Sequence, residues 1–275
     1  MPELPEVETI TRSLDKILPG KVFQQVTVRY SGSLNCSSQA FKDQLIKQRI
    51  NQVWRRGKLI VLDLKENLHL VFHLKMSGRL LYESGSDWQL DKHSHLIFEF
   101  YEQGYLIFHD TRKFGYCSLL NSNALYQWTY FAGLGPEPLD LNEDEFVHIF
   151  QKSRARIKSV LLDQSKIAGI GNIYADESLH EAGIHPATPC CQLDQDRLRK
   201  LSLSLKGVLL RSIQAGGTTL RDYVDGLGNP GNYQNGFMAY GRKGLPCKTC
   251  STLLESCKVA GRTTVYCPKC QPLSI

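Results

Sequence analysis

Four cysteines near the C-terminal end constrain this chain more than any other feature of its sequence. They form two Cys-x2-Cys pairs, Cys247/Cys250 and Cys267/Cys270, with 16 residues between the pairs. Each pair lets two sulfurs converge on one metal ion, and two pairs complete a tetrahedral Zn²⁺ site with no open position for catalysis. The spacing therefore predicts one structural zinc ion, which replaces a hydrophobic core in a C-terminal zinc ribbon.

The remaining composition is that of an intracellular globular protein. The 275 residues are 42% hydrophobic, and the nine cysteines are an odd number. The N-terminal sequence is acidic and lacks the apolar segment of a secretory signal, and no apolar run approaches the roughly 18 residues of a membrane helix. We therefore expect a cytoplasmic protein with no membrane association and no disulfide framework. The cysteines outside the zinc pattern are interpreted as small buried or surface thiols: Cys36, Cys117, Cys190, Cys191 and Cys257.

The formal net charge is +6, and much of it lies near the C-terminal end. Residues 236–275 contain six Lys or Arg residues against one Glu, and zinc bound by four thiolates reduces this excess without removing it. A local excess of this kind favours a polyanionic partner, with phosphate the first candidate. Taken alone, however, such an excess more commonly means a solubilising basic surface.

The first part of the chain predicts a helix followed by many strands. Apolar residues recur at helical spacing from Val7 to Leu18, and Pro19-Gly20 ends the pattern. Strand-like segments follow at 22–30, 50–56, 58–64, 68–76, 95–101 and 104–110. Strands this dense indicate a sandwich or barrel. We therefore expect an α+β fold that begins with a leading helix and a sandwich or barrel of strands in residues 1–132, followed by a Gly/Pro-rich linker at 133–145.

Beyond the linker the apolar period becomes helical, which predicts a helical domain over 146–235 and leaves 236–275 for the zinc finger. A long amphipathic helix is expected over 198–217. A short glycine turn leads into another helix at Asn172, whose free N-terminal amides make a natural phosphate seat. Residues 217–240 are rich in Gly, Asn and Tyr and are interpreted as a long mobile loop.

The N-terminus itself is a chemical group of interest. If Met1 is removed, Pro2 becomes a secondary amine, which is a nucleophile toward a sugar aldehyde carbon. The adjacent Glu3 could move protons during such a reaction. Many proteins begin with Met-Pro, and Glu3, Glu6 and Glu8 also suit the start of a helix. Taken alone, these residues favour the ordinary helix start.

Seven segments read together resemble the bacterial formamidopyrimidine-DNA glycosylase family over essentially the whole chain. In chain order they are MPELPEVE, RRGK, HLKMSG, DTRKFG, AGIGNIYADE, GGTTLRDY and AGRTTVYCPKC. The resemblance implies a base-excision repair enzyme that is both a DNA glycosylase and an apurinic/apyrimidinic (AP) lyase. Such an enzyme removes 8-oxoguanine and formamidopyrimidines from double-stranded DNA, also acts at abasic sites, and cuts the strand by β,δ-elimination. It implies that residues 1–132 form a catalytic β-sandwich domain and that residues 146–235 form a helix-two-turn-helix DNA-binding domain. It also implies a bacterial protein that acts as a monomer and is associated with the nucleoid through DNA.

The resemblance also implies the catalytic residues. Pro2 attacks C1′ of the damaged nucleotide and holds it as a Schiff base, and Glu3 acts as the acid/base partner. Lys58 contacts phosphate and assists at the lesion. Arg262, together with Asn172, grips the phosphates that flank the lesion.

Further residues match DNA-contacting positions of the family. Met76, Arg112 and Phe114 fill the space that the extruded base leaves, and His73 and Lys75 touch the backbone. Without the resemblance, Met76 and Phe114 would be interpreted as ordinary core residues. Their chemistry suits the role, because a thioether is flexible, a guanidinium can hydrogen-bond the orphan cytosine and a ring can wedge a base step.

The resemblance also implies residues that recognise the lesion, and they come from two parts of the sequence that are far apart. Glu6 corresponds to an acidic residue near the lesion base, although its charge also suits a helix start. The loop that closes over an extruded 8-oxoguanine is matched by Thr218, Thr219, Leu220, Arg221, Asp222 and Tyr223.

The chain departs from the family pattern at two positions. Thr263 follows Arg262 where the family usually has glycine, and Ser94 stands where aspartate is common. Because glycine permits a positive φ, we expect the turn that holds Arg262 to differ slightly. No consequence follows from Ser94.

Two other functions remain to be considered. One is an endonuclease VIII-like enzyme for oxidised pyrimidines, although that branch typically opens with PEGPE and this chain has PELPE. The other is a non-catalytic zinc-ribbon protein that binds damaged DNA, which the combination of Pro2, Glu3 and Lys58 makes less favoured.

Overall fold

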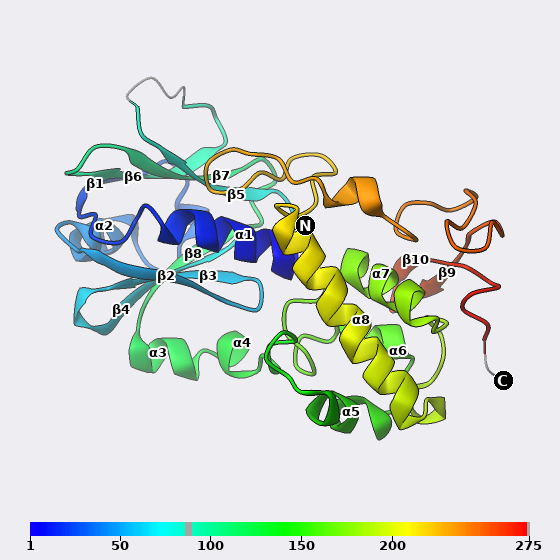
Figure 1. Ribbon diagram of the computed structural model, residues 1–275. Coiled ribbons are helices and arrows are strands. Elements are labelled where there is room, and N and C mark those ends of the chain that lie inside the picture. Colours follow the sequence, from blue (N-terminus) through cyan, green and yellow to red (C-terminus); the bar gives the residue numbers. More distant parts are fainter. Residues whose placement is uncertain (86–89, 274–275) are drawn as a thin grey trace. The chain divides into compact units, whose positions relative to one another are not determined.

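The computed structural model describes residues 1–85 and 90–273. The chain forms two compact units (Figure 1). The first comprises Met1–Ala132 and Ala215–Asn232, and the second comprises Gly133–Gln214 and Tyr233–Ile275. Among the described residues, no helix combines the length and the apolar character needed to cross a membrane.

Two four-stranded antiparallel sheets form the framework of the first unit. Their strand orders are β1-β6-β7-β5 and β2-β3-β4-β8. The strands are β1 (Phe23–Val28), β2 (Ile50–Arg56), β3 (Leu59–Leu64), β4 (Leu68–His73), β5 (Gly78–Glu83), β6 (Ser94–Phe100), β7 (Tyr105–Asp110) and β8 (Tyr116–Asn121).

One hydrophobic core joins the two sheets. Phe72 on β4 packs edge-on against Phe98 on β6, with 5.9 Å between ring centroids, and lies 5.8 Å from the ring of Phe108 on β7. All three side chains are buried, as are apolar residues from every other strand of both sheets. The expected β-sandwich is therefore confirmed.

The strand prediction missed β5 and β8. Each lies at the edge of its sheet and has one neighbouring strand there. Edge strands tolerate polar residues, and both strands accordingly end in one, at Glu83 and Asn121. Their sequences therefore lack the long apolar runs of the central strands.

A leading helix, α1 (Leu4–Asp15), packs against β2 and places Val7, Ile10 and Leu14 in the sandwich core. It ends earlier than expected, and Leu18 is buried in the turn that follows. The unit also contains α2 (Ser38–Leu45), which the sequence did not predict, the short helices α3 (Ser122–Gln127) and α4 (Thr129–Ala132), and the 3-10 turns η1 (Ser31–Ser33) and η2 (Lys65–Asn67).

Residues 215–232 belong to the first unit, although we assigned them to the helical domain from sequence. The Gly226 N–H donates to Ser13 Oγ of α1 at 3.1 Å, and the Gly226 carbonyl accepts from the Tyr82 N–H of β5 at 2.8 Å. Tyr223 packs against the sandwich core. These partners are up to 213 positions away in the sequence, so local composition could not reveal them.

The second unit is built on helices. They are α5 (Glu143–Gln151), α6 (Ile157–Leu162), α7 (Asn172–Ala182) and α8 (Gln195–Gln214), with the 3-10 turns η3 (Cys190–Gln192) and η4 (Tyr233–Gly236). The long helix α8 packs on α5 and α7. It ends just before Gly216 and Gly217, whose φ angles of 76° and 84° stop a right-handed helix.

A side chain organises the glycine turn between α6 and α7. The Gln164 amide group donates to the carbonyl of Ile170 at 2.8 Å and accepts from the N–H of Gly169 at 2.9 Å. Gly169 has a φ of 84°, which favours glycine. The turn ends at Gly171, the N-cap of α7, so Asn172 is the first residue of that helix as expected.

A two-stranded hairpin, β9 (Glu255–Val259) and β10 (Arg262–Tyr266), carries the expected arginine at its turn. Ala260 and Gly261 form the two-residue loop, with φ angles of 49° and 71°. Two positive φ angles are typical of a type I′ turn. Thr263 lies in β10 and pairs with Lys258. The positive φ angles of this turn fall on residues 260 and 261, and Thr263 itself has no positive φ.

Candidate functional site

The N-terminal segment places its chemical groups at the start of α1. Pro2 is buried and directly precedes Glu3, the N-cap residue of the helix. The Glu3 N–H donates to Glu6 Oε2 at 2.8 Å, which satisfies one backbone donor at the helix start. Glu3 and Glu6 are only 3% and 2% exposed. Two acidic side chains are thus held in a buried setting next to Pro2.

Glu6 also holds the loop that follows α8. Its second oxygen, Oε1, accepts from the Thr218 N–H at 2.8 Å. The Tyr223 hydroxyl donates to the backbone carbonyl of Glu6 at 3.3 Å, or to that of Gly216 at 3.1 Å. Burial raises the pKa of Tyr223, so its hydroxyl stays protonated at neutral pH. The sequence analysis gave Glu6 two interpretations, a charge at the helix start and, from the resemblance, a residue near the lesion base. In the structure its carboxylate accepts from both the helix start and the loop.

The loop from Thr218 to Tyr223 has an anchored part and an exposed part. Thr219 Oγ1 donates to the Tyr223 carbonyl at 2.9 Å and accepts from the Gly231 N–H at 2.8 Å. Between these anchors Leu220 is 52% exposed, and Arg221 and Asp222 are also exposed. The exposed residues form the part of the loop that is accessible to a ligand.

Lys58 lies in the two-residue loop between β2 and β3 and is only 6% exposed. The residue before it, Gly57, has a φ of 55°, which favours glycine. Arg55 donates to the Gly57 carbonyl at 3.0 Å and forms a 2.7 Å ion pair with Glu8 of α1. The turn that presents Lys58 is therefore tied to the same helix that begins next to Pro2.

His73 pairs with Leu59, the residue after Lys58, across the β3–β4 ladder. Burial, and to a smaller extent the charges of Lys75 and Lys58, lower the pKa of His73 to about 3. Its Nδ1 accepts from the Lys75 N–H at 3.0 Å, which leaves the proton on Nε2, 3.4 Å from the Tyr130 hydroxyl. His73 is therefore neutral at pH 7 and holds the backbone of Lys75.

The residues expected to enter DNA are exposed on two loops of the first unit. Met76 is 43% exposed and Phe114 is 56% exposed. Neither is therefore a core residue, which is how their apolar character alone would be interpreted. The Arg112 guanidinium lies 4.9 Å from the centroid of the Phe114 ring, a cation–π contact that holds both side chains together. Lys75 makes a similar contact with the Tyr116 ring at 5.4 Å.

Asn172 and Arg262 are brought close together in the second unit. Asn172 Nδ2 donates to the carbonyl of Thr263, the residue after Arg262, at 3.1 Å. Arg262 is exposed at the end of the hairpin turn. The N-terminal end of α7 and the arginine of β10 therefore form one local surface that combines a helix N-terminus with a positive charge, which suits phosphate.

A buried ion pair supports this arrangement, and sequence reasoning missed it. Lys158 of α6 and Asp176 of α7 are fully buried, with 2.5 Å between Nζ and Oδ1. Lys158 also donates to Thr264 Oγ1 at 2.7 Å, and Asp176 Oδ2 accepts from the Val265 N–H at 3.2 Å. The only available signal was a lysine within the apolar run IKSVLL.

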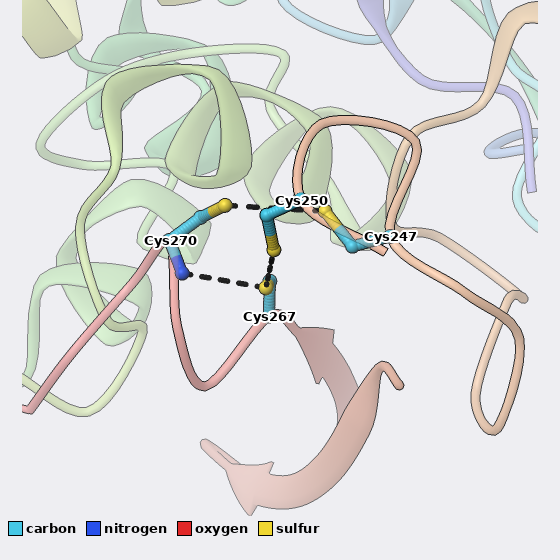
Figure 2. Close-up of side chains that lie close together, drawn as sticks. All are labelled: Cys247, Cys250, Cys267 and Cys270. Atoms are coloured by element: carbon cyan, nitrogen blue, oxygen red, sulfur yellow. Dashed lines mark hydrogen bonds between the residues drawn. The ribbon is translucent and has the colours of Figure 1, made fainter. Parts of the chain in front are cut away.

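The four cysteines of the zinc pattern converge in the second unit (Figure 2). All four sulfurs lie within 4.8 Å of one another. The sulfur–sulfur distances are 4.0 Å for Cys247–Cys270 and 3.4 Å for Cys250–Cys267. Zinc–sulfur bonds of about 2.3 Å in a tetrahedron place sulfurs about 3.8 Å apart. The residues therefore form a site for one zinc ion.

The zinc site is joined to α7 and has little apolar core of its own. His180 Nε2 lies 3.4 Å from Cys247 Sγ, a hydrogen bond that sequence reasoning did not predict. Leu254 and Val265 pack with Cys247 and Cys267 in a small buried apolar cluster. Glu177 accepts the N–H groups of residues 238–240 at 2.8–2.9 Å, which attaches the chain leading into the ribbon. None of the nine cysteines, all of which lie in the described part of the chain, is paired in a disulfide; Cys117 and Cys190 are buried, and Cys191 is exposed.

The predicted site residues divide between the two units. Asn172, Arg262 and the four cysteines belong to the second, and all the others belong to the first. Ser94, the second departure from the family pattern, donates to Asp91 Oδ1 at 3.0 Å. A β-sandwich with a leading helix, a helical unit and a four-cysteine site together define a zinc-finger protein of the helix-two-turn-helix class.

Comparison with known proteins identifies the family. Residues 1–117 match the N-terminal domain of formamidopyrimidine-DNA glycosylase, residues 134–224 match its H2TH domain, and residues 244–273 match a zinc finger found in FPG and IleRS. The chain is 42% identical to the formamidopyrimidine-DNA glycosylase of Desulforamulus reducens, over 98% of this chain and 99% of the relative. It is 39% identical to that of Enterococcus faecalis, over 99% and 98%. The chain belongs to the formamidopyrimidine-DNA glycosylase family.

Solved structures of this family have the same fold. A G226P mutant of Lactococcus lactis FPG, bound to DNA containing Fapy-dG, superposes with a TM-score of 0.91 at 35% identity, covering 98% of this chain and all of that one. A MutM complex with DNA containing carbocyclic 8-oxo-G gives a TM-score of 0.90 at 35% identity, with the same coverage.

Proposed function

We propose that this chain removes oxidised purines, 8-oxoguanine and formamidopyrimidines, from double-stranded DNA and then cuts the strand at the abasic site. The names of its relatives and the lesions in the DNA of its structural neighbours support this assignment. The relatives are bacterial, which supports action on the nucleoid DNA of a bacterial cytoplasm.

One observation in the structure carries the proposal. The Glu6 carboxylate accepts from the N–H of Glu3 with one oxygen and from the N–H of Thr218 with the other. Glu3 directly follows the proposed nucleophile Pro2. One side chain, that of Glu6, therefore holds both Glu3 and the proposed lesion loop. This arrangement suits a site where an extruded base lies between the loop and the amine.

The proposed chemistry begins at the chain's own N-terminus. Removal of Met1 makes Pro2 a secondary amine with an unperturbed pKa of about 7.7–8.0 as an α-amino group, so a useful fraction is neutral. The amine forms a bond to C1′ as the damaged base leaves, and opening of the sugar ring gives an iminium. Glu3 moves the protons of ring opening and of the two eliminations that release the 3′ and then the 5′ phosphate.

Residues of both units would bind and position the DNA. Lys58 neutralises phosphate near the lesion, and Arg262 and Asn172 hold the flanking phosphates. Zinc, when bound, supplies no chemistry to the reaction and stabilises the ribbon that presents Arg262. Met76, Arg112 and Phe114 occupy the space vacated by the base, which offsets part of the few kcal/mol that extrusion costs.

Borohydride trapping tests the nucleophile and the lesion class together. Wild-type protein with an 8-oxoguanine·cytosine duplex should give a covalent adduct that mass spectrometry locates at a Met1-free Pro2. Pro2→Gly should trap poorly while its unfolding temperature stays close to that of wild type. Normal trapping by Pro2→Gly would contradict the assignment of the nucleophile.

A panel of lesions separates the other functions. An endonuclease VIII-like enzyme would prefer an oxidised pyrimidine over 8-oxoguanine. A non-catalytic protein would bind damaged duplex without trapping or strand cleavage on any lesion, and Pro2→Gly would not change its binding.

A further inference from the structure

Asp110 is a fully buried carboxylate at the end of β7, between the two loops that carry the exposed DNA-facing residues. The loop between β4 and β5 carries Met76, and the loop between β7 and β8 carries Arg112 and Phe114. Asp110 lies in the sheet itself, where it pairs with Gly78 of β5. Its backbone is therefore fixed, and its side chain can serve as a reference point for both loops.

The Asp110 carboxylate accepts hydrogen bonds from both loops. Its Oδ1 accepts from Ser77 Oγ at 2.5 Å, next to Met76, and from the Arg112 N–H at 3.1 Å. Its Oδ2 accepts from the Gly115 N–H at 2.7 Å, next to Phe114. Each exposed residue is therefore within one position of a hydrogen bond to the same carboxylate.

The backbone of both loops is in a conformation that needs such support. Lys75 and Lys113, next to Met76 and Phe114, have φ angles of 50° and 57°, which are unfavourable for residues with a side chain. The backbone at Gly115 lies directly against the Asp110 carboxylate. A Cβ added there would be 2.7 Å from the Phe108 ring and 3.1 Å from Asp110 Oδ2, so a larger residue would not fit without a shift.

We propose that Asp110 is a positioning residue that fixes the Met76 loop relative to the Arg112–Phe114 loop, and so determines how well the enzyme reads the base opposite the lesion. This inference rests on the proposed function, because it needs DNA with an extruded base. The two carboxylate oxygens accept at all three sites, whereas an amide would present a donor at one of them. When the loops are ordered before binding, the entropy cost of ordering them does not fall on the step in which they enter the duplex.

Two variants test the proposal, and a third is the matched control. Asp110→Asn replaces one acceptor oxygen with a donor, and Ser77→Ala removes a single hydrogen bond without placing a new polar group in the protein. Asp91→Asn is the control. Asp91 also accepts from three groups, His93 N–H, Ser94 Oγ and His109 Nε2, but not from either loop.

The readout compares a duplex with a single strand. Single-turnover excision of 8-oxoguanine opposite cytosine and opposite adenine measures discrimination of the partner base. Borohydride trapping on a single-stranded abasic oligonucleotide measures the amine chemistry where there is no partner base and no space to fill. We expect Asp110→Asn to lower the preference for cytosine by about tenfold and Ser77→Ala by about threefold, with single-strand trapping within about twofold of wild type. Asp91→Asn should behave as wild type.

Two results would overturn the proposal. One is unchanged discrimination in both Asp110→Asn and Ser77→Ala. The other is an equal loss on the duplex and the single strand, which would mean a general structural role. If Asp110→Asn does not fold, Ser77→Ala decides. If wild type neither traps nor excises, the proposed function fails, and this outcome is separate from the inference about Asp110. Fluorescence of 2-aminopurine opposite a tetrahydrofuran site still reports insertion of the two loops into the duplex. Equal fluorescence signals from wild type and Ser77→Ala would then overturn the inference.

Discussion

The Glu6 carboxylate accepts a hydrogen bond from the Thr218 N–H, with 2.8 Å between Oε1 and the nitrogen. The two residues are 212 positions apart in the sequence. The contact joins the first turn of α1 to the proposed lesion loop inside the first unit. It makes one side chain responsible for both a helix start and a loop conformation.

Glu6→Gln should loosen the lesion loop. Glutamine offers one acceptor oxygen and one amide donor, so it cannot accept from Glu3 and Thr218 as the carboxylate does. Hydrogen exchange of the peptide that contains Thr218 should accelerate by about tenfold to a hundredfold, since a hydrogen bond to a charged group contributes about 1.5–3 kcal/mol. Glu145→Gln is the matched control, because Glu145 accepts from Asn142 in the same way at the start of α5 and contacts no such loop. Equal exchange in Glu6→Gln and wild type would refute the prediction.

Removal of a single zinc ligand should release the metal. Cys270→Ala leaves three thiolates and an open position in a site that has only a small apolar cluster to hold its shape. Elemental analysis should find less than stoichiometric zinc, and binding to duplex DNA should weaken. Cys257→Ala changes a cysteine of the same ribbon that is not a ligand, and it should keep one zinc. Full zinc content in Cys270→Ala would contradict the assigned site.

His180→Phe should weaken zinc retention without removing a ligand. The imidazole lies 3.4 Å from Cys247 Sγ, and a donor to a thiolate stabilises its negative charge. Loss of such a partner typically lowers metal affinity by about 10–100-fold. Competition with a chromogenic chelator measures the change. His185→Phe is a suitable control, because the His185 ring packs on Tyr266 and its Nδ1 accepts from the Ala187 N–H. Identical zinc release from His180→Phe and wild type would exclude this role.

Loss of one partner of the Lys158–Asp176 pair should destabilise the second unit. Lys158→Met leaves a carboxylate buried without its cation, which costs about 3–5 kcal/mol. The double variant Lys158→Met/Asp176→Leu should recover a large part of that loss, because no charge stays buried. Urea unfolding of the single and double variants measures the coupling. Additive losses would mean that the two side chains do not act as a pair.

His73 should stay neutral well below neutral pH. Its pKa is lowered to about 3 in the folded state, whereas an unfolded histidine titrates near 6.5. Between these values the unfolded state binds the extra proton, so His73 makes the free energy of unfolding fall as the pH decreases from about 6.5 toward 3, by up to about 1.4 kcal/mol per pH unit. NMR should find the folded ring unprotonated at pH 5, with its proton on Nε2, and protonated at the same pH in urea. A folded-state titration near pH 6 would contradict the assignment.

Patterns local in sequence predicted much of the fold. The zinc spacing, the helix start at Asn172 and the apolar central strands such as β3 each depend on residues close together in the chain. Edge strands β5 and β8 and the short helix α2 were missed, because marginal apolar content decides such elements only in their tertiary setting.

The site was predictable in parts. The resemblance located the exposed Met76 and Phe114, which residue chemistry alone would have placed in a core. It did not reveal what holds them, because the contacts of Asp110 depend on the pairing of β5 with β7. Likewise, nothing in the sequence near Lys158 indicates that its partner lies 18 positions later on another helix.

Three contacts of α7 with the ribbon recur every fourth residue. Asn172 reaches Thr263, Asp176 reaches Val265 and His180 reaches Cys247. Successive contacts are therefore about 6 Å apart along one face of the helix. Inserting or deleting one residue between them would rotate the following part of the helix by about 100° and separate it from its partners. The number of residues in this stretch is therefore under stronger constraint than the identity of any one of them, and related chains should vary here by substitution and not by length.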